Sequence, residues 1–212
     1  MLPLKTMISL ACMLISGSAG LLVWSRLPKV TRLLILQSFF AFIITIAARQ
    51  WSPNTWLYNL YMPLDFALVI CSSTAFLSRS FVKRYLPLSI GLYTIIWICS
   101  WVTSGLEKYL FNWSFLIGCV LISAFYMAVL FQATLKCSSY KLKSIYCLCL
   151  ANLFYYAGAV PLFGLLNYLN IHYPATAKVL FLSNLVLSDL RYLLVGLFFI
   201  SYARNNKRVG LK

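Results

Sequence analysis

The sequence predicts an all-α fold: an integral membrane bundle of seven transmembrane helices, with the N-terminus outside and the C-terminus in the cytoplasm. Two observations support this prediction. Hydrophobic residues make up 62% of the 212 residues and charged residues only 10%, whereas a soluble domain is roughly 25% charged. The basic residues also alternate between rich and poor connections, as the orienting charges of a multi-pass protein do.

Seven apolar segments account for most of the chain, and with some tilt each is long enough to cross a bilayer. The length leaves no room for a soluble domain, so residues 1–212 form one transmembrane domain that ends in a basic cytoplasmic tail, residues 203–212. A polar loop is expected at residues 167–178. The predicted spans are residues 6–24, 33–48, 56–78, 87–103, 113–135, 144–166 and 179–202.

The connections between these spans carry unequal numbers of basic residues. Thirteen Lys and Arg residues fall on one side and four on the other, while Arg191 lies inside the last span. Such an excess marks the cytoplasmic side. The thirteen are Arg26, Lys29, Arg32, Arg79, Lys83, Arg84, Lys136, Lys141, Lys143, Arg204, Lys207, Arg208 and Lys212, and the four are Lys5, Arg49, Lys108 and Lys178.

The first apolar segment has a rival interpretation as a cleaved signal peptide, because it contains a run of small residues at 16–20. A signal peptide carries its positive charge before the apolar region. Only Lys5 precedes this segment, while Arg26, Lys29 and Arg32 follow it. The charge bias therefore favours a retained helix with its N-terminus outside.

Prolines divide into two positional classes. Pro87 is expected at the start of the fourth span, where the first-turn amides lack helical partners in any case. Pro63 and Pro161 fall inside the third and sixth spans. They are expected to kink those helices and to open space between neighbours.

Three charged residues are predicted near the middle of the membrane: Asp65, Asp189 and Arg191. Asp65 is nine residues past Trp56 and Asp189 ten past Val179, so each lies about 14–15 Å below the outer end of its span. Arg191 lies about 3 Å deeper. Charges at this depth cost about 2.5–3.5 kcal/mol each on insertion scales, so they mark paired or functional positions.

Helical spacing predicts which polar residues share a face. Asp189 and Arg191 are two residues apart and project about 200° from each other, so Arg191 needs a partner on another helix, and Asp65 is the candidate at the right depth. Asp65 shares a face with Tyr58 and Tyr61, Arg191 with Asn184 and Ser188, and Asp189 with Leu185 and Tyr192.

Two interpretations of this polar layer stay open. Asp65 and Arg191 are either a buried ion pair that sets helix register, or part of a polar cavity for a ligand, a solute or a proton. Asn59 and Asn152 are expected to form hydrogen bonds between helices.

The composition argues against several functions. We expect no metal site, because His172 has no acid or cysteine nearby, and no disulfide framework, because six of the seven cysteines fall in apolar spans and Cys137 lies in a basic loop. We expect no nucleic-acid partner, because the basic residues are explained by topology. Microbial rhodopsins hold retinal on a lysine of the last span. No predicted span contains a lysine, so retinal is disfavoured and no cofactor is expected.

The start of the third span, WLYNLYMPLDF at residues 56–66, resembles a Y-N-x-Y-x-P-hydrophobic-acid-F pattern in small, largely uncharacterised seven-helix membrane proteins of Bacteroidota-type bacteria. The likeness covers this span and the general layout. It implies a bacterial inner-membrane protein that works beside signalling components, and it assigns no chemistry to any residue.

Three functions are compatible with these features. The first is a multi-pass, non-enzymatic inner-membrane protein that senses a small ligand, or that serves as a membrane partner of another protein through its basic loops and tail. The second is a carrier of a small solute or protons that uses Asp65, Asp189 and Arg191. The third is an intramembrane enzyme that modifies lipids or carotenoids, although no catalytic pair or phosphate-binding loop is present in the sequence.

Overall fold

The computed structural model of the protein describes residues 4–51, 54–106, 110–136 and 139–209. Within these ranges the chain is entirely helical, with seven α-helices, three short 3-10 segments and no strand. The α-helices are α1 (Leu4–Leu22), α2 (Leu33–Gln50), α3 (Thr55–Ser73), α4 (Arg79–Ser104), α5 (Asn112–Lys136), α6 (Ser139–His172) and α7 (Pro174–Val209).

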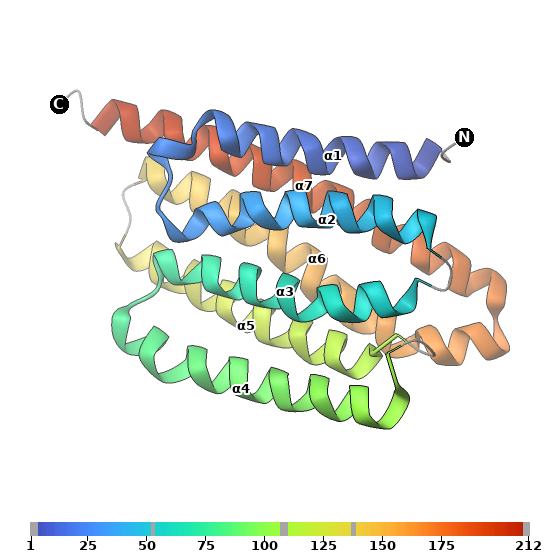
Figure 1. Ribbon diagram of the computed structural model, residues 1–212. Helices are drawn as coiled ribbons and strands as arrows, with labels where there is room; N and C mark the ends of the chain where they lie inside the picture. Colours follow the sequence, from blue (N-terminus) through green and yellow to red (C-terminus); the bar gives the residue numbers. More distant parts are fainter. Residues whose placement is uncertain (1–3, 52–53, 107–109, 137–138, 210–212) are drawn as a thin grey trace.

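The seven helices run antiparallel, one after another, around a common interior (Figure 1). Each packs against the next in the chain, and α7 closes the ring against α1. The helix α3 also packs against α5, so α4 lies outside the contact between them. One end of the bundle holds the N-terminus and the other the C-terminus. We call these the N-terminal end and the C-terminal end.

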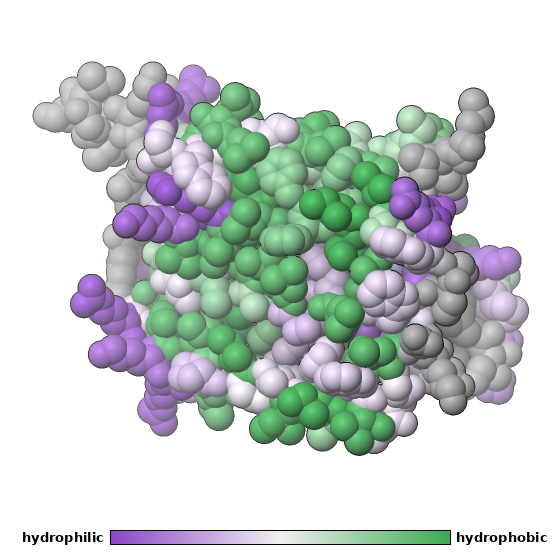
Figure 2. All heavy atoms as spheres, viewed as in Figure 1, coloured by the Kyte–Doolittle hydropathy of each residue, from purple (hydrophilic) through white to green (hydrophobic). Residues whose placement is uncertain are grey.

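Six of the seven helices are long and apolar enough to cross a membrane. The helix α3 is not among them, although it has 19 residues, as α1 does. Its hydropathy is lowered by Asn59, Pro63, Asp65 and its tyrosines. Figure 2 shows hydrophobic side chains across the middle of the molecule and hydrophilic ones gathered near the two ends, as expected for a bundle embedded in lipid.

The fourth helix differs from the prediction, which began it near Pro87. It starts at Arg79, where the Ser78 hydroxyl accepts a hydrogen bond from the Phe81 amide and caps the helix. Pro87 therefore lies inside the helix. The basic residues Arg79 and Lys83 belong to its first turns, so hydropathy identifies the apolar part of this helix and misses its polar start.

The predicted polar loop at residues 167–178 is also wrong. The helix α6 continues to His172 and α7 begins at Pro174, so that Tyr173 alone separates them. Pro174 suits a first helical position, because its missing amide hydrogen has no helical acceptor there. The predicted tail, residues 203–212, is helical as far as Val209. Cys137, predicted in a basic loop, lies outside the described residues.

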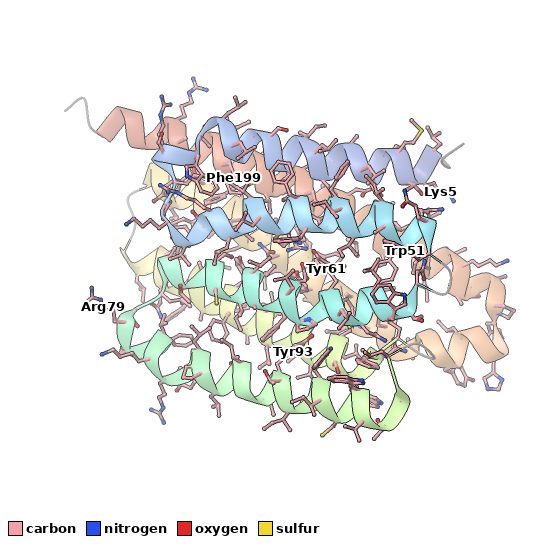
Figure 3. The ribbon with its side chains drawn as sticks, viewed as in Figure 1. Lys5, Trp51, Tyr61, Arg79, Tyr93 and Phe199 are labelled. Carbon is pink, nitrogen blue, oxygen red and sulfur yellow. The ribbon has the colours of Figure 1, made fainter. Side chains whose placement is uncertain are left out.

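The half of the bundle toward the C-terminal end is tightly packed. Leu34, Ile35, Val69, Ile70 and Phe199 are fully buried in one core cluster. Figure 3 shows Phe199 between α7 and the first two helices. Close packing extends to the backbone, because a Cβ atom on Gly20 would lie 2.4 Å from the Ile35 side chain. The interior of this half is therefore densely packed, and we call it the packed base of the bundle.

A proline inside α3 connects this helix to α4. Pro63 has no amide hydrogen, so the carbonyl of Asn59, four residues earlier, loses its helical partner. The indole nitrogen of Trp97 on α4 donates a hydrogen bond to this carbonyl over 2.9 Å. The exposed helix α4, in which only Ser89 and Tyr93 are buried, is thereby attached to the centre of α3.

We predict that Trp97→Phe lowers the free energy of unfolding by about 1–3 kcal/mol, the cost of removing a partner from a buried polar group. In a Pro63→Ala background the cost should be smaller, because the restored amide can donate to the Asn59 carbonyl. Unfolding in detergent of the two single variants and the double variant measures this coupling. Trp113→Phe, at a position 74% exposed, is the control. Additive effects of the two changes would contradict the explanation.

Candidate functional site

A cavity of about 630 Å³ occupies the half of the bundle toward the N-terminal end. It is lined by residues from all seven helices, with Tyr93 as the contribution of α4. Lys5, Arg49 and Asn54 line it at the N-terminal end of the bundle, which we call its mouth, whereas Asp65 and Arg191 line it from the middle of α3 and α7, which we call its deep part. Figure 3 shows Lys5 at the same end as Trp51, with Tyr61 in the interior.

The Asp65 carboxylate is held by three uncharged donors from three helices. Its Oδ1 accepts hydrogen bonds from Gln37 Nε2 on α2, at 2.7 Å, and from the Tyr61 hydroxyl on α3, at 3.1 Å. Its Oδ2 accepts one from the Tyr156 hydroxyl on α6, at 2.9 Å. Hydrogen bonds to an ionised group are roughly twice as strong as neutral ones, so these donors replace much of the water that the carboxylate would otherwise need.

Gln37 extends this network to a fourth helix. Its amide nitrogen lies 3.1 Å from the Tyr192 hydroxyl on α7 and 3.4 Å from that of Tyr61, and the side chain is 2% exposed. Gln37 was not among the predicted site residues, although it is the one strongly polar residue of the second predicted span. Counting 13 residues back from Gln50 places it about 20 Å from the end of α2 at the N-terminal end of the bundle, about 5 Å further in than Asp65.

Arg191 is buried among aromatic rings. It is 3% exposed, and its Nε donates to Asn152 Oδ1 over 3.1 Å. The guanidinium carbon lies 4.6 Å from the ring centroid of Tyr156, 5.2 Å from that of Tyr155 and 5.5 Å from that of Tyr192. Aromatic faces at such distances stabilise a cation. The Nη2 atom is buried and has no hydrogen-bond partner among the described residues.

The predicted Asp65–Arg191 partnership is indirect. The structure records no ion pair between these two side chains, both of which lie in the described part of the chain. Tyr156 stands between them: its hydroxyl donates to Asp65 while its ring faces the Arg191 guanidinium. A tyrosine bridge therefore replaces the direct pair. Neither Tyr155 nor Tyr156 was among the predicted site residues, because the rotation of α6 about its axis could not be deduced from depth alone.

Asp189 lies apart from this cluster. As its spacing from Arg191 predicts, it points in another direction and faces Ser9 and Cys12 of α1. It does not line the cavity, although Leu185 and Tyr192, predicted to share its face, do. Its Oδ1 is buried without a hydrogen-bond partner among the described residues. The structure therefore does not bring Asp189 into the cavity with Asp65, because a shared depth does not imply a shared face.

The other predicted site residues divide between the cavity and the packing. Tyr58, Asn184 and Ser188 line the cavity beside Asp65 and Arg191, as their helical spacing predicts. Asn59 is fully buried and holds the α4–α5 connection: its Nδ2 donates to the Leu106 carbonyl and its Oδ1 accepts from the Phe111 amide. Asn152 orients Arg191 from outside the cavity. Asn152 thus forms the expected hydrogen bond between two helices, α6 and α7, whereas Asn59 joins α3 to the connection between α4 and α5.

The chain matches no protein-family model, no curated protein and no solved structure. The function must therefore be argued from the geometry of this cavity.

We predict that Tyr156→Phe destabilises the protein more than Tyr155→Phe does. Both changes keep a ring against Arg191, but only the first removes a hydrogen bond to Asp65. Hydrogen bonds to charged groups contribute about 1.5–3 kcal/mol, so the Tyr156 variant should lose about this much free energy of unfolding. Denaturant unfolding in detergent measures the difference. Equal losses would show that the aromatic contacts, not the carboxylate, account for the stability.

Proposed function

We propose that the protein is a seven-span inner-membrane protein, with its N-terminus outside and its C-terminus in the cytoplasm, that senses a small ligand bound in this cavity. The charge distribution supports the orientation, because cytoplasmic connections of membrane proteins carry excess Lys and Arg. At the C-terminal end the described basic side chains are Arg26, Lys29, Arg32, Arg79, Lys83, Arg84, Lys143 and Arg204, and at the N-terminal end they are Lys5, Arg49 and Lys178.

The position of α3 supports a seventh span. It lies in the ring between α2 and its other neighbours, α4 and α5. Its polar residues Tyr58, Tyr61 and Asp65 line the interior cavity, where they do not oppose insertion as lipid-facing groups would. The bacterial inner membrane as its location rests on the resemblance of the WLYNLYMPLDF segment.

The observation that carries the ligand-binding proposal is the burial of charged groups around an open space. Ionisable residues within a membrane are expensive and mark functional sites by default. Here Asp65 and Arg191 line a cavity of about 630 Å³, within the range of about 300–1,000 Å³ that is typical of small-molecule sites. A bundle that needed these residues for register alone would close around them.

Sensing is favoured over carriage because the cavity is one-sided. Its mouth is at the N-terminal end, while the half toward the C-terminal end is filled by the core that contains Ile35, Ile70 and Phe199. A ligand that enters from outside therefore meets a packed base. Its binding would be transmitted through the helices to the basic cytoplasmic surface, where a protein partner or anionic lipid would respond.

Topology is tested with reporter fusions. We predict that a fluorescent protein fused after Ser78 or after the C-terminus fluoresces, and that alkaline phosphatase is active when fused after Gln50 or Gly105. The physical reason is the cytoplasmic retention of basic connections. If α3 did not cross the membrane, fusions after Gln50 and Ser78 would report the same side.

Ligand binding is tested by filling the cavity. Ser188 lines it, whereas Ser183 on the same helix is exposed and bonds only its own backbone, at the Val179 carbonyl. A ligand at about 100 times its Kd stabilises a protein by about 2.7 kcal/mol. We predict that Ser188→Phe abolishes thermal stabilisation by compounds that stabilise the wild type in a library screen, and that Ser183→Phe does not. Unchanged stabilisation of the Ser188 variant would place the binding elsewhere.

A further inference from the structure

We infer that the ligand is a single-chain amphiphile with an oxyanion head, such as a carboxylate or a phosphate ester, and that the head binds Arg191 deep in the cavity. This inference rests on the ligand-binding function proposed above and adds the chemical class of the ligand. It is carried by an unpartnered buried donor, the charge of the cavity lining and the apolar character of its middle section.

Arg191 has a hydrogen-bond donor that is not used within the described part of the chain. The Nε atom is occupied by Asn152, but Nη2 is buried, has no hydrogen-bond partner among the described residues and belongs to a side chain that lines the cavity. A buried donor left unpaired costs about 1–3 kcal/mol, and more when it is charged. An acceptor oxygen of a ligand would remove this cost, and an oxyanion would add a charge-assisted bond.

The net charge of the cavity lining favours an anionic ligand. Its charged residues are Lys5, Arg49 and Arg191 against Asp65, a formal excess of two positive charges. Asp65 already accepts three hydrogen bonds, so it has little capacity left for a cationic ligand. Lys5 and Arg49 at the mouth would attract anions before they enter. An anionic ligand is therefore favoured over a neutral or cationic one.

The lining between the mouth of the cavity and Arg191 is mostly apolar, although it includes Tyr58, Asn184 and Ser188. Ile44, Met62, Phe163, Phe181 and Leu185 line the cavity, and the 11 residues from Asn54 to Asp65 span about 16 Å along α3. The polar groups of a polar metabolite would lack hydrogen-bond partners beside these apolar side chains. An alkyl chain would instead bury apolar surface there, which stabilises binding by about 25 cal/mol per Å². The head thus lies at Arg191 and the chain points toward the mouth.

The test uses the full-length protein in detergent and a set of probes with one chain and different heads: decanoate, decyl phosphate, decanol and decyltrimethylammonium. Binding is measured by isothermal titration, with thermal stabilisation as a second readout. We expect one or both anionic probes to bind at least tenfold more tightly than decanol, and the cationic probe to bind most weakly. A preference for decanoate indicates a fatty acid as the source of the head group, and a preference for decyl phosphate indicates a single-chain phosphate ester such as a lysophospholipid.

Variants locate the head group. Arg191→Lys keeps the charge but removes the planar donor pair. It should lower the affinity for the favoured anionic probe at least tenfold and leave the affinity for decanol unchanged. Arg204→Lys, on the same helix but exposed and outside the cavity, should bind all probes as the wild type does. The ranking of heads on the wild type keeps the inference testable even if Arg191→Lys does not fold.

The outcomes separate this inference from the proposed function. If decanol binds as tightly as both anions, and Ser188→Phe loses all binding, the ligand has no oxyanion head. The proposal that the cavity binds a ligand would then still hold. Anion binding that Arg191→Lys does not weaken would overturn the assignment of the head to Arg191. Binding of every probe unchanged in Ser188→Phe would overturn both.

Discussion

The Asp65 carboxylate is the group on which the arrangement of the deep site depends. An ionised carboxylate inside an apolar bundle is stable only if the protein replaces its hydration shell. Here three uncharged donors from α2, α3 and α6 do so, and Gln37 passes the network on to Tyr192 of α7. The relative rotation of α2, α3 and α6 is therefore constrained by one acceptor, because a different rotation of any of them would take a donor away from the charge.

This network also explains how Arg191 remains available. A direct ion pair with Asp65 would neutralise both groups and use the donors of the guanidinium. Tyr156 keeps the two apart by giving its hydroxyl to the acid and its ring to the base. The cation is stabilised by aromatic faces, which occupy no hydrogen-bonding hydrogen. The site thus holds a buried positive charge whose donor capacity is only partly used.

The bundle divides into a packed half and a hollow half, and the division has energetic consequences. Toward the C-terminal end, side chains from neighbouring helices pack closely in the interior. Toward the N-terminal end the cavity forfeits that packing energy. Elements that bind ligands are generally drawn from the less stable part of a structure. The solid half supplies the stability that allows the other half to stay open.

Much of the architecture could be predicted from the sequence, because membrane insertion imposes simple rules. Apolar segments and loop charges located all the helices, and depth counting brought Asp65 and Arg191 to one layer. The same rules gave wrong or incomplete predictions for features that hydropathy and depth do not determine. Hydropathy detects contact with lipid, so it missed the polar helical turns before Pro87 and across residues 167–178. Depth alone does not specify rotation, so Gln37 and Tyr156 were missed, and Asp189 was grouped with a cluster that it does not join in the structure.

The contact between Trp97 and the helix interrupted by Pro63 has an evolutionary consequence. A chain that replaced Pro63 would regain the amide hydrogen for the Asn59 carbonyl and release position 97 from the need for an indole. A chain that lost Trp97 first would carry a buried carbonyl in want of a donor. During evolution the two positions are therefore expected to change together, with the proline replaced before the tryptophan. This coupling is expected although the two residues lie on different helices and the hydrogen bond involves no ligand.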